Sequence, residues 1–173
     1  MAVRTRLGLL LGLALAAALP AQAAGTATPQ EVVEKVRAAA ALLASEGEAG
    51  LAQFQGPGSA WVWKDSYVYV SSCETGRLLA HPTQPARQGQ PIADGPTYGG
   101  VTAAEREKGQ CAAAARPGGG WYAYPFPKPG SDAPSRKVSY LVTVPGQAMI
   151  VGAGVYDETT SEAELEAVSA AAK

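Results

Sequence analysis

The sequence predicts an α+β fold, in which a five-stranded antiparallel sheet carries a long N-terminal helix and a short C-terminal helix, with the helices segregated to one side. Three observations support this prediction. Apolar residues recur at helical spacing near residue 30. Two segments in the middle of the chain and three near its end are rich in β-branched and aromatic residues, as strands are. Gly- and Pro-rich turns separate these segments.

The sequence predicts that residues 1–23 form a secretory signal peptide. Arg4 and Arg6 form a short basic region, an apolar run follows, and small residues at positions 21 and 23 fit the usual cleavage pattern. The apolar run is short for a membrane span, although an uncleaved anchor is the alternative. Cleavage near Ala23 or Ala24 would deliver the mature protein to the periplasm as a secreted protein.

The mature chain, residues 24–173, is about 150 residues long, which suits a single domain with its own core. Removal of Arg4 and Arg6 takes the formal charge from −1 to −3. The chain has no basic stripe and no polybasic segment, so nucleic acid and anionic lipid are not expected partners. No second apolar stretch is long enough to span a membrane, so we expect no transmembrane segment after cleavage.

Cys73 and Cys111 are the two cysteines of the chain. An exported protein enters an oxidising compartment, where two thiols can pair, and we favour a disulfide over two buried thiols. The bond would close a loop of about 38 residues and would contribute about 3–4 kcal/mol in a chain-entropy model.

The first helix is expected to start at Thr28, which can cap it, with Pro29 at its first position and Glu31 completing a capping box. An apolar stripe of Val, Ala and Leu residues then continues to about Glu46, and the helix should end near Gly47. A second short helical piece is expected around residues 51–54.

A hairpin follows, because residues 61–71 alternate aromatic and β-branched side chains and Glu74-Thr75-Gly76 forms a tight turn. Its second strand, residues 77–81, ends at Pro82. Residues 82–100 are rich in Pro and Gly and predict a long irregular loop, of a kind that is more often functional than idle. Residues 101–115 return to helix-forming residues, and we expect Glu105 to Lys108 to be exposed there.

The last three strands are expected at residues 121–126, 137–144 and 149–156. Between the final two, Pro145-Gly146 suits the central positions of a type II turn. A C-terminal helix should begin at Thr160 or Ser161, where Glu164 completes another capping box.

An ordered series of short segments runs through the chain, at residues 67–70, 74–76, 81–82, 121–124, 125–130, 137–140 and 152–156. This series resembles a single Cache domain, the extracytoplasmic ligand-sensing domain with a PAS-like sheet. The resemblance covers residues 28 to about 158. It implies a long N-terminal helix on a five-stranded sheet, with a small-molecule pocket between the sheet and the long loop.

The resemblance also implies a function and a partner. Ligands of such domains are commonly small organic acids, with amino acids and amines also represented. Sensors of this family usually continue into a membrane helix and a signalling domain, whereas this sequence ends at Lys173. The expectation is a stand-alone periplasmic sensor that passes its signal to a separate membrane kinase, chemoreceptor or transporter.

Lys137 is the leading candidate for binding a carboxylate, because a lysine inside a strand among aromatic neighbours can form a charge-assisted hydrogen bond. Arg136 must point to the opposite face of the strand. The alternative is an exposed edge lysine. His81 is the sole histidine, and it can either donate to a ligand oxygen or bond to loop backbone.

Aromatic side chains supply the other candidate ligand-binding residues. Strand periodicity prevents Trp121 and Tyr124 from facing the same side, so one of them belongs to the core. The full aromatic set, each member of which can also be a packing residue, is Tyr69, Trp121, Tyr124, Tyr140 and Tyr156. In the long loop, Asp94 and Tyr98 could close over the pocket.

Three functional hypotheses remain. The first is a small-molecule sensor, with a carboxylate favoured over an amine because of Lys137. The second is a structural or protein-interaction module whose pocket is filled by its own side chains. The third, an enzyme using His81, is disfavoured, because one histidine permits neither a histidine-rich metal site nor more than one triad, and no nucleophile elbow accompanies it. We expect no cofactor and no metal.

Overall fold

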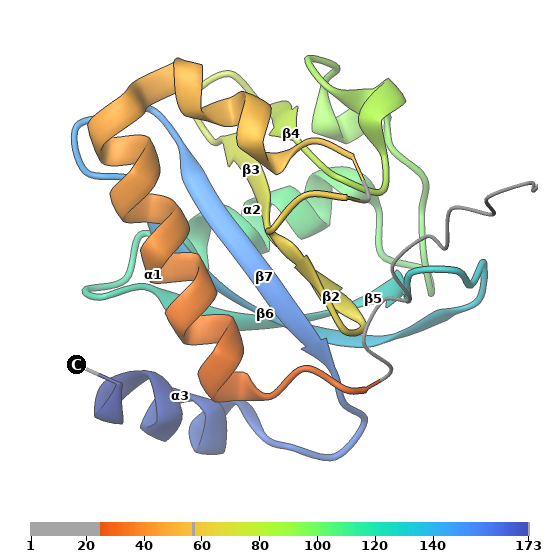
Figure 1. The fold of residues 1–173 in the computed structure, drawn as a ribbon. Helices are drawn as coiled ribbons and strands as arrows, with labels where there is room; N and C mark the ends of the chain where they lie inside the picture. The colour runs from red at the N-terminus through yellow and green to blue at the C-terminus, as the bar shows by residue number, and fades with distance from the viewer. Residues whose placement is uncertain (1–24, 57, 173) are drawn as a thin grey trace, which may run out of the picture.

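The structure is a computed structural model, and it describes residues 25–56 and 58–172. The predicted signal peptide, residues 1–23, lies outside the described residues. Figure 1 shows the elements in chain order. They are α1 (Pro29–Glu46), η1 (Gly47–Phe54), β1 (Val62–Trp63), β2 (Ser66–Tyr67), β3 (Tyr69–Ser72), β4 (Arg77–Ala80), η2 (Pro85–Arg87), η3 (Ile92–Asp94), α2 (Ala103–Ala114), β5 (Gly120–Pro127), β6 (Pro134–Thr143), β7 (Ile150–Tyr156) and α3 (Glu162–Ala171).

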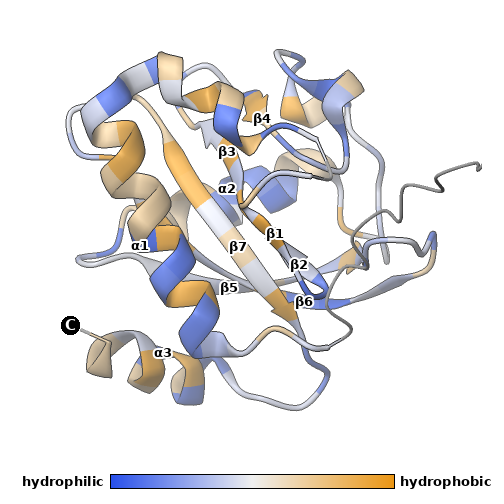
Figure 2. Cartoon of the chain, in the orientation of Figure 1, coloured by the Kyte–Doolittle hydropathy of each residue, from blue (hydrophilic) through white to orange (hydrophobic). Residues whose placement is uncertain are grey.

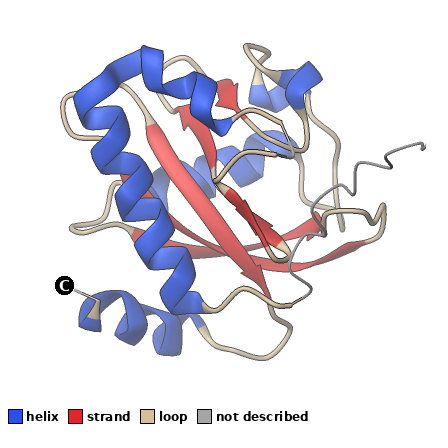
Figure 3. Ribbon diagram, in the orientation of Figure 1, coloured by secondary structure: helices blue, strands red, loops and turns tan. Residues whose placement is uncertain are grey.

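The main sheet has five antiparallel strands in the order β4-β3-β7-β6-β5, and β1 and β2 form a separate two-stranded ribbon (Figure 3). β7 therefore lies in the centre, between the first hairpin and the β5–β6 hairpin. This arrangement confirms the predicted α+β fold with five antiparallel strands.

The helices cover both faces of the sheet, so the prediction that they lie on one side was wrong. In Figure 1, α1 crosses in front of the sheet and α2 lies behind it. α3 packs with α1 and β5. The physical reason lies in β7, whose seven residues are all buried, so each of its faces needs a covering layer.

α1 forms as the sequence predicts. Thr28 Oγ1 accepts a hydrogen bond from the Glu31 N–H, and the Glu31 carboxylate accepts one from the Thr28 N–H. The helix ends at Gly47, whose φ of 60° suits a residue without a side chain. Capping boxes also begin α2 at Thr102 and α3 at Ser161, the latter as predicted.

Residues 61–71 do not form one continuous strand. The chain turns at Lys64, which has a positive φ of 47°, and the Asp65 carboxylate accepts a hydrogen bond from the Ala27 N–H at 2.7 Å. The break divides the segment into β1, β2 and β3. The hairpin from β3 to β4 then follows as predicted, as does the turn before β7, where the Gln147 N–H donates to the Val144 carbonyl across Pro145-Gly146.

The main hydrophobic core lies between α1 and the sheet. Figure 2 shows hydrophobic residues along α1 and β7 where the two elements meet. Val33, Val36 and Leu43 of α1 are fully buried there against Val151 and Val155 of β7. In the described part of the chain, no helix has the length and apolar character needed to cross a bilayer.

Candidate functional site

A cavity lies on the sheet face opposite α1, closed over by α2 and the loop between β4 and α2. Its volume is about 60 Å³, counted as the space open to the centre of a water molecule, which leaves room for a few waters or one small molecule. The lining residues are Tyr67, Tyr69, Ser71, Leu78, His81, Gln84, Arg87, Ile92, Arg106, Gln110, Tyr124, Phe126 and Lys137.

Strand register places Lys137 on the face that borders this cavity. Lys137 of β6 is paired with Tyr124 of β5 and with Tyr156 of β7, so the three side chains share one face. Val138 and Tyr140, one and three residues further along β6, belong to the core under α1. The alternation of a strand therefore separates a polar cluster from an apolar core.

Lys137 is 1 % exposed, and its ammonium is surrounded by aromatic rings. Among the described residues it has neither a hydrogen-bond acceptor nor a carboxylate partner. Burial lowers the pKa of Lys137 to about 7, and the more distant charge of Asp65 opposes this shift. From Nζ, the ring centroids lie at 4.1 Å for Tyr67, 5.2 Å for Phe126, 5.3 Å for Tyr156 and 5.4 Å for Tyr69.

Two glycines of β7 create the space that these side chains occupy. A Cβ at Gly154 would lie 2.9 Å from Lys137 Cε and 2.6 Å from Ser139 Oγ. A Cβ at Gly152 would lie 2.6 Å from the Tyr69 ring. Lys137 and Tyr69 therefore lie over β7 because positions 152 and 154 carry no side chain.

Hydroxyl groups form a chain along the same face. Tyr124 Oη lies 3.3 Å from Tyr69 Oη and 2.9 Å from Ser139 Oγ. Burial raises the pKa of both Tyr69 and Tyr124, so the phenols are neutral and can donate or accept hydrogen bonds. These hydroxyls supply polar contacts for a ligand without adding a charge.

His81 directly follows β4 and is 4 % exposed. Its ring centroid lies 4.7 Å from that of Tyr67, and its Nδ1 lies 3.3 Å from Thr83 Oγ1. Burial, followed by the charges of Lys137 and Arg87, lowers the pKa of His81 to about 3. The imidazole is therefore neutral at physiological pH and can donate one hydrogen bond.

Arg106 of α2 is buried, so the prediction that residues 105–108 are all exposed was wrong at this position. Its guanidinium donates to the carbonyls of Val101 at 2.9 Å and Pro96 at 2.8 Å. It also packs over Tyr98 and Phe126, at 5.1 and 5.7 Å from the ring centroids. Arg106 thus joins the cavity wall to the end of the long loop.

A helical stripe in the sequence could have identified Arg106. The buried positions of α2 are Ala103, Arg106, Gln110, Ala113 and Ala114, which recur at intervals of three and four. The sequence pattern is easy to miss because the largest members of the stripe are polar, as residues on the solvated face of a helix usually are. Polar residues at core positions of a helix are a signal for a site on that face.

The charge of the cavity wall is positive. Lys137 and Arg106 are buried, Arg87 is half-buried, and no Asp or Glu is among the lining residues. Arg87 comes from η2 in the loop, where its guanidinium donates to the Pro91 carbonyl at 2.8 Å. This wall favours an anion and disfavours an amine.

The structure brings five of the predicted site residues together and places two elsewhere. Lys137, His81, Tyr69 and Tyr124 line the cavity, and Tyr156 packs against Lys137 with its hydroxyl donating to the Pro127 carbonyl.

Trp121 and Tyr140 lie on the α1 face, with ring centroids 5.3 Å apart. Arg37 donates to the Tyr140 hydroxyl. In the loop, Asp94 is exposed, whereas Tyr98 packs on Arg106 and Phe126.

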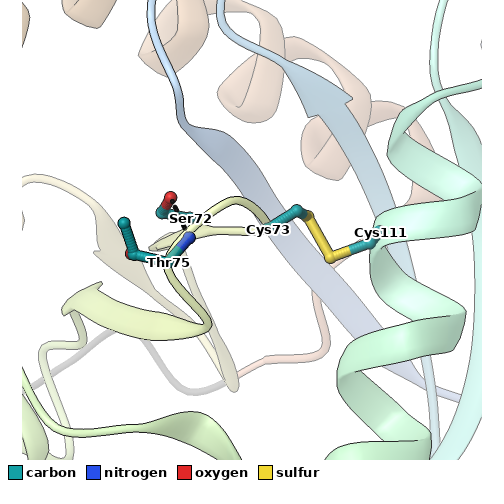
Figure 4. The surroundings of a disulfide bond; sticks show 4 residues. All are labelled: Ser72, Cys73, Thr75 and Cys111. Atoms are coloured by element: carbon teal, nitrogen blue, oxygen red, sulfur yellow. Dashed lines mark hydrogen bonds between the residues drawn. A yellow bond between two sulfur atoms is a disulfide. The ribbon is translucent and has the colours of Figure 1, made fainter.

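The predicted disulfide is confirmed. Cys73 and Cys111 are bonded, which ties the turn after β3 to α2 (Figure 4). The same figure shows the Thr75 N–H donating to Ser72 Oγ within this turn, at 3.2 Å.

The side chains around His81 do not resemble a hydrolytic triad. Thr83 is its one hydrogen-bond partner within the described ranges, and the cavity wall offers no carboxylate to orient the ring. In residues 25–56 and 58–172, no group of three His, Cys, Asp or Glu side chains could hold a metal ion.

Solved structures with the same fold include proteins and domains of chemotaxis and chemosensing. A methyl-accepting chemotaxis protein from Vibrio parahaemolyticus RIMD 2210633 is 16 % identical, with a TM-score of 0.57 over 75 % of this chain and 88 % of that one. A periplasmic sensor domain of a chemotaxis protein is 26 % identical, with a TM-score of 0.53 over 73 % and 90 %. A Cache chemosensory domain, solved to explain carboxylic acid recognition, is 23 % identical, with a TM-score of 0.54 over 75 % and 88 %.

A family model agrees with these structural neighbours. No curated protein sequence matches the chain significantly. The model described as "Cache domain" matches residues 58–168, which is more than half of the chain and includes every strand and α2. The chain therefore belongs to the Cache domain family.

Proposed function

We propose that this domain senses a short organic acid, whose carboxylate binds Lys137 in the cavity. The observation that carries the proposal is a buried ammonium that faces a small cavity without an anionic partner in the described chain. A buried charge without a partner is costly, and a ligand carboxylate would remove this cost by forming a charge-assisted hydrogen bond.

The cavity wall also narrows the class of acid. An amino acid would bring an ammonium group to a wall that offers two buried cations and no carboxylate. The cavity of about 60 Å³ suits a molecule of a few heavy atoms rather than a long dicarboxylate. Aromatic walls favour an apolar or hydroxylated tail. The proposed ligands are therefore short monocarboxylates such as acetate, propionate, lactate or pyruvate.

The proposal has two further parts. The domain binds its ligand without converting it, and it passes the signal to a separate membrane protein. The similarity to sensor domains of chemotaxis proteins supports a periplasmic location. Sequencing the N-terminus of protein recovered from the periplasm tests the cleavage prediction, which requires a mature chain that starts at Ala24 or Gly25. Recovery of the uncleaved chain in the membrane fraction would contradict it.

The alternative is a protein-interaction module that binds no ligand. In that case, the domain's own side chains would fill the pocket. The open cavity under the long loop supports ligand binding over this alternative.

Calorimetry with matched ligands tests the proposal. Each acid is compared with its amide, which has nearly the same shape but no charge, and with the corresponding amine. We expect saturable binding of at least one acid and none of its amide or amine. At one hundred times its dissociation constant, the acid should stabilise the fold by about 2.7 kcal/mol. Equal binding of acid and amide would reject a carboxylate site.

Two lysine variants separate the site from general charge effects. Lys137→Met keeps the length of the side chain but removes the ammonium, so we expect at least a hundredfold loss of affinity for the acid. Lys108→Met removes the charge of an exposed lysine on α2 and should bind as the wild type does. Similar affinities for both variants would show that Lys137 is not the anchor.

A further inference from the structure

The disulfide encloses one wall of the cavity in a covalent ring. Cys73 and Cys111 are 38 residues apart, and the ring between them contains β4, the long loop and most of α2. More than half of the lining residues come from inside the ring, including His81, Arg87 and Arg106. The remaining lining residues come from the sheet strands outside the ring, including Lys137.

α2 has little hydrophobic anchoring of its own. Its buried apolar side chains are those of Ala103, Ala113 and Ala114, and its larger buried residues, Arg106 and Gln110, are polar. Alanine removes little apolar surface from water compared with leucine or valine. Noncovalent packing alone therefore gives α2 a weak hold on the sheet.

The helix nevertheless lies very close to β5. A Cβ at Gly109 would lie 2.1 Å from the Tyr122 ring, so the backbone of α2 rests directly on this side chain. Two residues further along, Cys111 forms the bond to the turn after β3 (Figure 4). The covalent bond thus holds α2 at the point where it approaches the sheet.

The bond is open to reagents in solution. Cys73 is exposed, and Cys111 is partly exposed. A thiolate needs access to only one sulfur to start exchange; Cys73 is the more accessible partner, whereas Cys111 packs partly buried against the core.

We propose that the Cys73–Cys111 disulfide is a positioning element for ligand binding, so that the affinity of the site depends on the oxidation state of these cysteines. This inference rests on the proposed function. In the reduction step, a dithiol such as dithiothreitol attacks the disulfide. The S–S bond breaks, two electrons and two protons pass to the protein as two thiols, and the reductant becomes a cyclic disulfide. α2 is then free to move away from the sheet, taking Arg106 with it.

Hydrogen exchange and calorimetry, done on the oxidised and the reduced protein, test the inference. In the reduced protein we expect faster amide exchange in residues 77–114, with unchanged protection in α1 and β7. The affinity for the acid identified above should fall at least tenfold on reduction and recover on reoxidation. A double variant, Cys73→Ala with Cys111→Ala, should match the reduced protein and should not respond to dithiothreitol.

Two outcomes would overturn the inference. Equal affinity of the oxidised and reduced proteins would show that the bond does not position the site. Loss of protection in α1 together with α2 would show that the bond stabilises the whole fold instead. If the oxidised protein binds none of the acids, the proposed function fails, but the exchange pattern still decides whether the bond holds α2.

Discussion

The two faces of the same sheet are built in opposite ways. On the α1 face, the buried side chains are apolar and large, as in Leu43, Trp121 and Val151. On the α2 face, the sheet buries Lys137, while α2 contributes Arg106 and the residue directly after β4 is His81. Adjacent residues of β6 belong to opposite faces, so a single strand serves both.

This difference indicates that one face of the sheet stabilises the fold and the other forms the binding site. Burial of apolar area stabilises the fold at roughly 25 cal/mol per Å², whereas a buried cation without a partner destabilises it. The α1 face supplies the stability that lets the α2 face keep a charged, partly empty cavity. If this division is correct, substitutions on the two faces should separate stability from binding.

The largest expected effect is on the α1 face. Leu43→Ala should lower the free energy of unfolding by about 2–5 kcal/mol, because it leaves a cavity in a fully buried site. The dissociation constant of the acid, measured below the melting transition, should stay within twofold of the wild type. A large change in affinity would show that the two faces are coupled, and the comparison would fail.

On the α2 face, replacing a buried side chain should raise the free energy of unfolding instead of lowering it. Without ligand, at pH 6, Lys137→Met should raise the free energy of unfolding by about 1–4 kcal/mol, since apolar packing replaces a buried charge. The matched control is Lys64→Met, because Lys64 pairs with Glu31 at 2.7 Å near the surface, and its loss should cost about 0–1 kcal/mol. Denaturant unfolding measures both. A destabilised Lys137→Met would show that its ammonium has a favourable partner.

A smaller effect should come from the glycine that makes room for Lys137. Gly154→Ala should destabilise the fold by about 1–3 kcal/mol, because its Cβ would crowd Ser139 and Lys137. It should also weaken acid binding by moving the ammonium. Gly58→Ala is the control, since a Cβ there meets nothing within 4 Å. An unchanged affinity in Gly154→Ala would mean that the position of Lys137 is not set by β7.

Local signals predicted most of the fold. The capping boxes at Thr28 and Ser161, the turn at Pro145-Gly146 and the alternation along β6 each depend on neighbouring residues, which a sequence displays directly. The break at Lys64 was missed because its positive φ is stabilised by the tertiary contact of Asp65 with Ala27. The placement of α2 on the far face was also missed, since it depends on which faces of the sheet remain uncovered.

The candidate site was predicted only in part, because local strand alternation can be recognised in a sequence but burial by a distant loop cannot. Alternation along the strands implied that Trp121 and Tyr124 face opposite sides, and the structure assigns Trp121 to the core. Tyr140 was predicted as a ligand-binding residue, but it is three residues from Lys137 on the same strand, and the structure places it on the other face, in the core under α1. Arg106 was missed because a polar residue on a helix suggests the solvated face, and its partners, the carbonyls of Pro96 and Val101, become apparent only once the loop is folded over it.

The prediction that sharpens the comparison most is the pH dependence. The pKa of Lys137 is about 7 in the folded protein, below its ordinary value of 10.5, so the unfolded chain binds more protons between these values. Stability of the ligand-free protein should therefore rise with pH from about 7 to 10.5. His81, with a folded pKa of about 3 against 6.5, should add a rise between pH 3 and 6.5.

Acid binding should show the opposite trend, because the carboxylate needs the protonated ammonium of Lys137. Affinity should be constant between pH 5 and 7 and then fall about tenfold for each pH unit above 7, which corresponds to about 1.4 kcal/mol per unit. Calorimetry at a series of pH values measures this slope, and unfolding of Lys137→Met should lack the stability rise above pH 7. Stability and affinity would then change in opposite directions because both depend on the charge of Lys137. The ligand would gain affinity by pairing with an ammonium whose burial is unfavourable when no ligand is bound. An affinity that does not change between pH 7 and 9 would separate these two quantities and remove Lys137 from the site.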